Sequence, residues 1–163
     1  MASPVRASNH GEPDNLMQTW LGTYAAAHPD VRAATNTTLQ LGPDDTPQPD
    51  ALLYRVGGAC AADAQGYLAG PPGLVVEIAS SSVSRDAREK LVTYRRARIP
   101  EYLLWRVEEE AIDWFRLEED EYRTLVPGDG GFLASSEFPG LRLDVSAALR
   151  LDAAAVLAGL RPV

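Results

Sequence analysis

The sequence is poor in the residues that build disulfides and in those that build nitrogen- or sulfur-based metal sites. Cys60 is the only cysteine among 163 residues, which excludes an internal disulfide and a cysteine-rich zinc cluster. His10 and His28 are the only histidines, too few for a histidine-rich metal site. A single cysteine fits a reducing compartment, so we expect a cytoplasmic protein.

Long apolar runs and an excess of positive charge are also missing. The apolar runs are far shorter than the roughly 20 residues of a membrane-spanning helix, and the N-terminus lacks the apolar segment of a signal peptide. We therefore expect no membrane partner. The formal net charge of −8 argues against broad, non-specific binding of nucleic acid. Length and a hydrophobic content of 45% predict one globular domain over residues 1–163, with 1–11 as a loose leader.

Lysine is almost absent as well. Lys90 is the only lysine, and the other 14 of the 15 basic side chains are arginine. Arginine replaces lysine poorly where a compact ammonium group is needed. The single lysine makes its ammonium group a candidate functional group, and an ordinary surface lysine that remains by chance is the alternative.

The most informative stretch, residues 73–105, reads as strand, polar turn, helix and strand. Residues 74–79 form a short, apolar and β-branched run that is typical of a buried strand. Glu77 interrupts this run. A carboxylate in an apolar strand is costly unless it is paired or bound to a metal, so Glu77 is a candidate functional residue.

A helix is predicted over residues 84–98, with Ser84 as its N-cap. Asp86, Lys90 and Tyr94 follow one another at i, i+4 spacing on this helix. Side chains at that spacing share one helix face, so these three residues are expected to lie together.

The remaining elements follow from periodicity and from turn residues. A hairpin is expected across residues 107–110, and Asp152 is a suitable N-cap for the last helix. The sequence predicts helices at 12–27 and 153–160, strands at 32–41, 50–56, 101–106, 111–117 and 122–126, and a surface loop at 57–73.

Asp50 and Glu77 are the candidate metal ligands. Asp50 begins one predicted strand and Glu77 lies near the end of another, so the two carboxylates meet at one sheet edge if the strands pair. Paired carboxylates repel each other unless a cation lies between them, and oxygen ligands suit Mg²⁺ or Mn²⁺. Lys90 could then orient or deprotonate a water molecule, or stabilise charge on a phosphate. The alternatives are a turn aspartate after Pro49 and a glutamate on a solvent face.

Five ordered segments carry a resemblance to a known family. These are QPDALLY, GYLAGPPGLVVEIASSS, SRDAREKLVTYRRARIPEYLLW, DWFRL and FPGLRLDVSAAL. Together they resemble the Uma-two family, bacterial proteins classed as endonucleases of the restriction-endonuclease-like superfamily, whose signature is PD-(D/E)xK. The resemblance implies an α/β (α+β) fold, in which helices flank a mixed central sheet and a C-terminal β-hairpin extends it. It also implies DNA as substrate, and a homodimer is a further arrangement to consider.

The resemblance also implies roles for individual residues. Asp50 and Glu77 would be the metal carboxylates, with the backbone carbonyl of Ile78 as a further ligand. The usual lysine of the superfamily would fall at Ala79, but in this family it is displaced onto the following helix, which matches Lys90. Candidates for accessory roles are His10, Asp86 and Tyr94.

Two other readings compete with a metal-dependent nuclease. A catalytically silent binding or scaffold protein is favoured by the net charge and by an N-terminus too short for the hairpin that precedes the first helix in family members. A metal hydrolase acting on another substrate is the third reading. The retained Asp50, Glu77 and Lys90 favour the nuclease.

Overall fold

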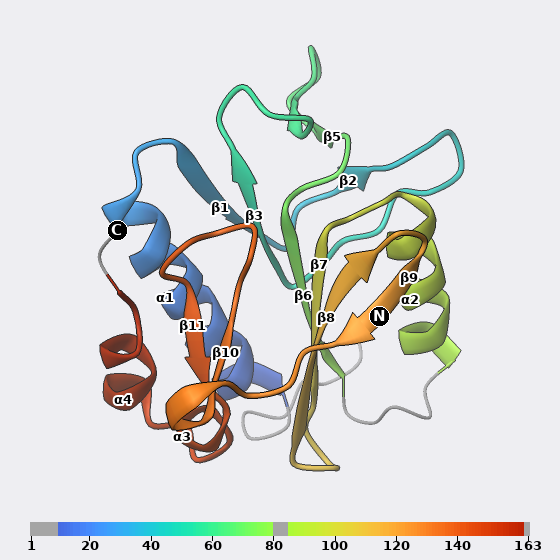
Figure 1. The fold of residues 1–163 in the computed structure, drawn as a ribbon. Coiled ribbons are helices and arrows are strands. Elements are labelled where there is room, and N and C mark those ends of the chain that lie inside the picture. Colours follow the sequence, from blue (N-terminus) through green and yellow to red (C-terminus); the bar gives the residue numbers. More distant parts are fainter. Residues whose placement is uncertain (1–9, 80–84, 162–163) are drawn as a thin grey trace.

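The centre of the fold is a six-stranded mixed sheet, seen in a computed structural model that describes residues 10–79 and 85–161 (Figure 1). Its strands lie in the order β1-β3-β6-β7-β8-β9. Only β6 and β7 are parallel, and the other neighbours in this sheet are antiparallel. The bounds are β1 (Val31–Thr35), β3 (Ala51–Arg55), β6 (Leu74–Ala79), β7 (Glu101–Arg106), β8 (Ala111–Glu118) and β9 (Glu121–Thr124). The predicted mixed sheet and the hairpin across 107–110 are confirmed.

Helix α1 (Glu12–Ala27) covers one face of this sheet. Its apolar residues recur at helical spacing, and Trp20 is fully buried against Trp114 of β8. The helix ends at His28, whose backbone N–H caps the carbonyl of Ala25. Both the predicted bounds and the predicted end residue are confirmed.

Helix α2 (Arg85–Arg96) lies on the opposite face (Figure 1). Its buried residues Ala87 and Tyr94 share a core cluster with Val75 of β6. The helix ends two residues earlier than predicted, because Arg98 adopts a left-handed φ of 59° and the Ile99 N–H bonds the Tyr94 carbonyl. The predicted N-cap, Ser84, lies outside the described residues.

The alternation of β6 divides its side chains between the two cores. Leu74, Val76 and Ile78 belong to the cluster on the α1 side, whereas Val75 belongs to the cluster on the α2 side. Successive strand residues point to opposite faces, so Glu77 faces α2. This placement decides which helix can supply its partners.

Two predictions between β1 and β6 were wrong. The strand expected at 32–41 is broken at Asn36, which has a left-handed φ of 47°, and the chain continues in a second sheet. That sheet has the order β2-β5-β4, with β2 (Leu39–Gln40), β4 (Ala61–Ala62) and β5 (Leu68–Ala69). The expected surface loop therefore contains two short strands, and its Cys60 is buried because it packs into the α2-side core.

The C-terminal part contains a helix and a separate pair of short strands that the sequence did not predict. Helix α3 (Val145–Leu149) was not predicted, and Asp144 caps it by accepting a bond from the Ala147 N–H at 3.0 Å. The predicted cap Asp152 is confirmed, since its Oδ1 accepts from the Ala155 N–H at 3.1 Å. The other elements are η2 (Asp129–Gly131), the antiparallel pair β10 (Phe132–Ala134) and β11 (Arg142–Asp144), and α4 (Ala153–Ala158).

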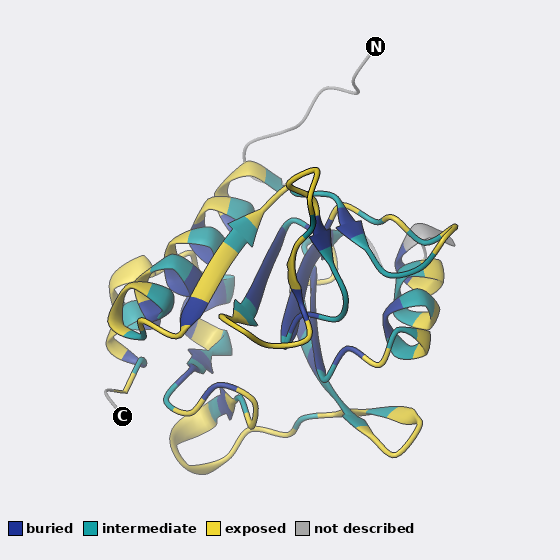
Figure 2. Cartoon of the chain, turned by 90° about the horizontal axis from the view of Figure 1, so that it is seen from above, coloured by how far each residue is buried: buried dark blue, intermediate teal, exposed yellow. Residues whose placement is uncertain are grey.

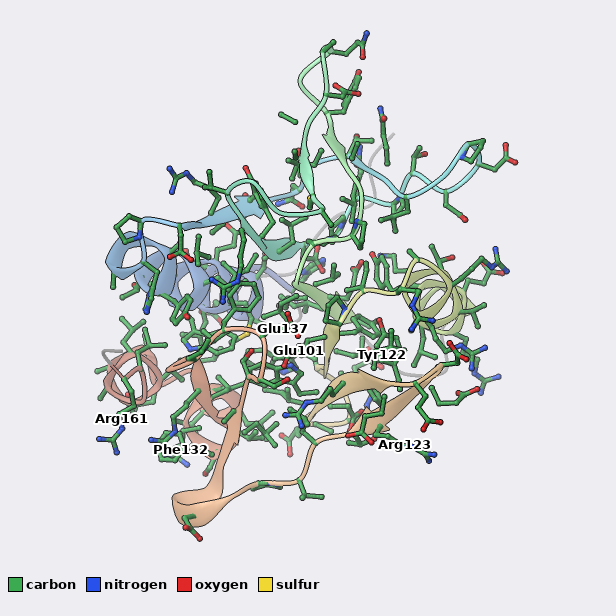
Figure 3. The ribbon with its side chains drawn as sticks, turned by 45° about the horizontal axis from the view of Figure 1, so that its top comes forward. Glu101, Tyr122, Arg123, Phe132, Glu137 and Arg161 are labelled. Carbon is green, nitrogen blue, oxygen red and sulfur yellow. The ribbon has the colours of Figure 1, made fainter. Side chains whose placement is uncertain are left out.

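Burial is concentrated in the middle of the sheet, as Figure 2 shows. In β6 and β7 five of six residues are buried in each strand, and each strand includes one glutamate, Glu77 and Glu101. Glu101 lies beside Glu137 (Figure 3), whose backbone N–H donates a hydrogen bond to it.

Within residues 10–79 and 85–161, no helix is long and apolar enough to cross a membrane.

The leader predicted at 1–11 falls mainly outside the described residues. His10 and Gly11 are described, and they already form a helical turn that leads into α1.

Candidate active site

Glu77 is the most deeply placed residue of the predicted site, with 4% of its surface exposed. The Lys90 Nζ donates a hydrogen bond to Oε2 at 2.8 Å, and the Tyr94 hydroxyl donates one to Oε1 at 2.5 Å. Lys90 and Tyr94 are four residues apart on α2, so one helix face supplies both donors. Both oxygens of the buried carboxylate therefore have a partner from the same helix.

Burial controls the proton affinity of this carboxylate. Desolvation raises the pKa of Glu77 to about 7, against the opposing effects of the Lys90 charge and the hydrogen bonds from Lys90 and Tyr94. The negative charge of Asp50 adds to the rise. Desolvation and the Glu77 charge also raise the pKa of Tyr94 far above its ordinary value, so its hydroxyl stays protonated and remains a donor.

Asp50 lies directly before β3, beside Glu77. The register pairs Ala51 with Val76, so one further step sets Asp50 opposite Glu77 on the α2 side of the sheet. Its Oδ2 accepts a hydrogen bond from the Ile78 N–H at 2.7 Å. Desolvation raises the pKa of Asp50, and this bond and the charges of His10 and Lys90 partly oppose the rise.

The predicted accessory residues differ in their contacts with the site. The His10 Nε2 lies 3.7 Å from the Asp50 Oδ1, so the turn before α1 reaches the site. Tyr94 contacts Glu77 directly. Asp86 belongs to α2, but its side chain lies outside the described part of the structure. Ile78 contacts Asp50 through its amide, and the metal-binding role of its carbonyl stays a prediction.

Asp14, which no sequence pattern distinguishes, also acts on this region. It lies in the first turn of α1, and its negative charge contributes to the raised pKa of Asp50. Its Oδ1 is buried and has no hydrogen-bond partner among the described residues. In the sequence, an acid after a proline at a helix start indicates only a favourable helix dipole, so no signal distinguished it.

The donor chemistry fits a hard divalent cation. No three His, Cys, Asp or Glu side chains converge on a metal position within residues 10–79 and 85–161. Two carboxylates, Asp50 and Glu77, suffice for Mg²⁺, which usually keeps several water ligands and takes one or two protein carboxylates. The charge of Asp14 acts on Asp50, and its Oδ1 has no hydrogen-bond partner among the described residues.

The arginines near α2 are largely matched by acids. Arg95 pairs with Glu121 at 2.6 Å and Arg98 with Asp120 at 2.6 Å, both across to the β8–β9 hairpin. Arg96 lies 3.8 Å from an oxygen of Asp45. The positive charge of Arg95, Arg96 and Arg98 is therefore partly neutralised within the chain itself.

A mixed sheet flanked by helices on both faces is the architecture of the restriction-endonuclease-like α+β proteins. The Uma2 family model, described as "Putative restriction endonuclease", matches residues 1–146. The chain belongs to the Uma2 family.

One of two similar solved structures supports this fold. A putative nuclease belonging to DUF820 from Anabaena variabilis ATCC 29413 superposes with a TM-score of 0.71 at 14% identity, covering 93% of this chain and 86% of the other. The type IIG restriction endonuclease BpuSI gives a TM-score of 0.46 at 14% identity, covering 96% of this chain and 18% of the other. No curated protein matches the chain.

Proposed function

We propose that this protein is a metal-dependent endonuclease that hydrolyses phosphodiester bonds in DNA. Asp50 and Glu77 would hold Mg²⁺ or Mn²⁺, with the Ile78 carbonyl as a further ligand, and Lys90 would act on the attacking water. The contact that carries the proposal is the 2.8 Å bond between the sole lysine and a glutamate that is 4% exposed. Burying this ion pair is costly, and a structural core at this position would be served as well by apolar residues.

Each side chain has a defined task in this proposal. When bound, the divalent cation would polarise the phosphate and make water a better nucleophile. The Lys90 ammonium orients the water or stabilises negative charge that develops on the phosphate. Tyr94 holds the Glu77 Oε1 in place, since its hydroxyl stays a donor. Glu77 must be ionised to serve as a ligand. The rise of its pKa to about 7 in the metal-free site opposes ionisation, whereas a bound cation would favour it.

The partners follow from the family rather than from a visible basic surface. The Uma2 description names restriction endonucleases, which supports DNA as the substrate of this chain. A cytoplasmic location and a homodimer stay predictions from the sequence.

A silent binding protein is the second candidate function. The observations that favour it are the net charge of −8 and the pairing of Arg95 and Arg98 with acids. Both weaken the long-range attraction of the chain for DNA. A metal hydrolase for a different substrate is the remaining alternative, which a substrate screen separates from a nuclease.

A plasmid cleavage assay decides between the first two candidates. The purified protein is incubated with supercoiled DNA and Mg²⁺ or Mn²⁺, beside Glu77→Gln and beside a reaction with a chelator. We expect nicked or linear product from the wild-type protein only, and only with the cation. Product from wild type and Glu77→Gln alike would reveal a contaminant, and no product from a folded, metal-binding wild-type protein would favour the silent reading.

A further inference from the structure

We propose that a second copy of this chain pairs with the outer edge of β1, antiparallel and around a two-fold axis at Ala34, and that Arg32 of each copy adds a positive charge to the acidic site of the other. The interface depends on the hydrogen bonding of β1 alone. The role of Arg32 rests on the proposed function, because it assumes that the site acts on DNA.

The outer edge of β1 has unpaired backbone groups. The Asn36 N–H bonds the Asp50 carbonyl at 3.2 Å, which continues the β1–β3 ladder by one residue. Because hydrogen-bonded pairs alternate along an antiparallel ladder, even-numbered residues of β1 bond β3 and odd-numbered residues face outward. The N–H and C=O groups of Ala33 and Thr35 therefore point away from the sheet, and they have no partner among the described residues.

The remaining outward residue of β1, Val31, is already bonded. Its N–H bonds the His28 carbonyl at 2.9 Å, and its carbonyl accepts from the Arg32 Nη1 at 3.0 Å. Pairing at this edge is thus restricted to Ala33 and Thr35. When Ala33 of one copy lies opposite Thr35 of the other, each of their N–H groups meets a carbonyl. With Ala33 opposite itself, Thr35 would stay unpaired, so the first register is preferred.

The side chains at this edge allow such pairing. Ala33 and Thr35 are exposed and small, and neither carries a charge. Proteins commonly protect a sheet edge with charged side chains, proline or a bulge, and residues 33–35 have none of these. A five-residue strand forms a small interface, so we expect a dimer whose population depends on the protein concentration.

The opposite edge of the sheet, β9, is less suited to a second copy. The Leu125 N–H bonds the Trp114 carbonyl, so by the same alternation Tyr122 and Thr124 face outward. The equivalent pairing of two β9 strands would place Arg123 opposite itself. Like charges directly opposite each other destabilise a strand pair, which favours β1 as the interface.

The register at β1 brings Arg32 to the site of the second copy. Arg32 lies opposite Asn36 of that copy, whose strand neighbour is Asp50, and Asp50 lies opposite Glu77. Arg32 shares the α2 side of the sheet with Ala34, and a two-fold axis perpendicular to the sheet keeps both α2 sides together. Strands are spaced by about 4.8 Å, so the Arg32 and Asp50 backbones would be about 10 Å apart, within reach of their side chains.

The charges of the two copies are complementary at this place. Arg32 is exposed, and its Nη1 donates only to two backbone carbonyls, at 2.8 and 3.0 Å. It has no acidic partner among the described residues. The site of the other copy has two carboxylates, Asp50 and Glu77, and the Lys90 ammonium in contact with Glu77 offsets one of them. The remaining negative charge attracts Arg32, whose planar guanidinium group also suits a phosphate of the substrate.

Sedimentation velocity at several protein concentrations tests the interface. We expect wild type to shift from monomer to dimer as the concentration rises. Ala33→Pro should stay monomeric, because it removes an outward N–H, and no bond to β3 is lost. Ala33→Lys keeps the backbone and adds like charges near the axis, so it should be monomeric as well. Thr124→Pro is the matched control, since it removes an outward N–H from β9, and it should dimerise like wild type.

Complementation in trans tests the role of Arg32. Arg32→Gln should cleave DNA several-fold more slowly than wild type, and Glu77→Gln should be inactive. In a mixture of the two, each mixed dimer has one intact site that receives Arg32 from the other copy. Cleavage by the mixture should therefore exceed that of Arg32→Gln alone. The gain should vanish when both partners also have Ala33→Lys.

The outcomes separate the interface, Arg32 and the proposed function. A wild type that stays monomeric at every concentration, or a dimer that Thr124→Pro dissociates and the Ala33 variants do not, refutes the β1 interface. A β1 dimer without gain on mixing refutes the role of Arg32 alone. A β1 dimer that binds Mn²⁺ and cleaves no DNA refutes the nuclease function and the role of Arg32, and the interface stands.

Discussion

The two buried glutamates of the parallel strands β6 and β7 have carboxylates that are stabilised by different kinds of partner. Glu101 is completely buried and Glu77 is 4% exposed, and they stand at opposite ends of the strand pair, since Glu101 pairs with Leu74 and Glu77 with Leu104. Both carry a carboxylate into the interior, where an unpaired charge is very costly. Their partners differ in kind.

Glu101 is satisfied by neutral donors from one loop. Its Oε2 accepts from the Ser135 hydroxyl at 2.7 Å, and its Oε1 accepts from the backbone N–H groups of Ser136 and Glu137 and from the Ser136 hydroxyl. Every donor lies within three consecutive residues. This arrangement holds the loop before Phe138 against the sheet, and it needs no further ligand.

Glu77 has charged and long-range partners instead. Its two oxygens face an ammonium group and a phenol, and burial raises its pKa to about 7. A carboxylate whose pKa lies near neutrality between a lysine and a second acid is a typical arrangement of functional sites. The comparison teaches that burial alone does not distinguish the two acids, whereas the charge and the origin of their partners do.

Among the variants that test the difference between Glu77 and Glu101, replacement of Lys90 is expected to have the largest effect, a loss of DNA cleavage. Lys90→Ala should lower DNA cleavage by about 10²- to 10⁴-fold, the range of a positioned acid–base group. Because lysine is not a ligand, Mn²⁺ binding should persist at alkaline pH, but loss of the ion pair raises the pKa of Glu77 further and lowers stability. Lys90→Arg should also be impaired, since arginine cannot be deprotonated and its planar fork aims differently. Plasmid cleavage, calorimetry and circular dichroism measure these effects. Wild-type cleavage by Lys90→Ala would end the catalytic assignment.

Glu101 should affect stability instead of cleavage chemistry. Glu101→Gln places an amide NH₂ among donors and removes charge-assisted bonds, so we expect a loss of about 3 kcal/mol in the free energy of unfolding. Urea unfolding measures it, and cleavage per folded molecule should stay near wild type. A loss of cleavage at full stability would instead join Glu101 to the active site.

The grouping of Asp50, Glu77 and Lys90 depends on local sequence patterns, and the sequence predicted it. An acid inside the apolar run 74–79, a helix beginning after it and a strand from Pro49-Asp50 were enough to bring Asp50, Glu77 and Lys90 together. Strand alternation and helical spacing are local properties, so each could be read without a structure.

Other parts depend on tertiary packing and left no local signal. The donors for Glu101 come from residues 34–36 positions further along the chain. The packing of α1 against β3 and β6 lets the charge of Asp14 act on Asp50, and no spacing rule in the sequence indicates this. The break at Asn36 depends on one left-handed residue within a strand-like pattern.

The pH dependence of stability should be changed by replacing Glu77 but not by replacing Glu101. The folded pKa of Glu77, about 7, exceeds its ordinary value of 4.5, so the folded state binds the proton more tightly. Its contribution to stability is therefore fully present below pH 4.5 and is lost as the pH rises through 7, by roughly 1–3 kcal/mol. Asp50 has a raised pKa and adds an effect of the same sign.

Urea unfolding with a chelator between pH 5 and 8 measures this loss. Glu77→Gln should flatten most of the decline and should be more stable than wild type at pH 8 without metal. Glu101→Gln should keep the decline while being less stable throughout. Parallel curves for wild type and Glu77→Gln would show that Glu77 does not titrate in this range.

The smallest effect is expected at Tyr94, whose hydroxyl links Glu77 to the aromatic core. Tyr94→Phe keeps the ring, which packs at 5.2 Å against the ring of Tyr102, and removes only the donor to Oε1. That donor lowers the pKa of Glu77, so its loss should raise the pKa further. The acidic limb of the pH profile of cleavage should then move to higher pH, with a loss of about ten-fold at pH 7 and little at pH 9, since a hydrogen bond to a charged group contributes about 1.5–3 kcal/mol.

Tyr122→Phe is the matched control, because the Tyr122 hydroxyl donates to the backbone carbonyl of Ile99 at 2.9 Å in the same core. It should lower stability by about 1 kcal/mol and leave the pH profile unmoved. A shift of the limb in Tyr94→Phe alone assigns the hydroxyl to positioning Glu77. Equal behaviour of the two variants would reduce Tyr94 to a packing residue, and the contrast between Glu77 and Glu101 would then depend on Lys90 and Asp50.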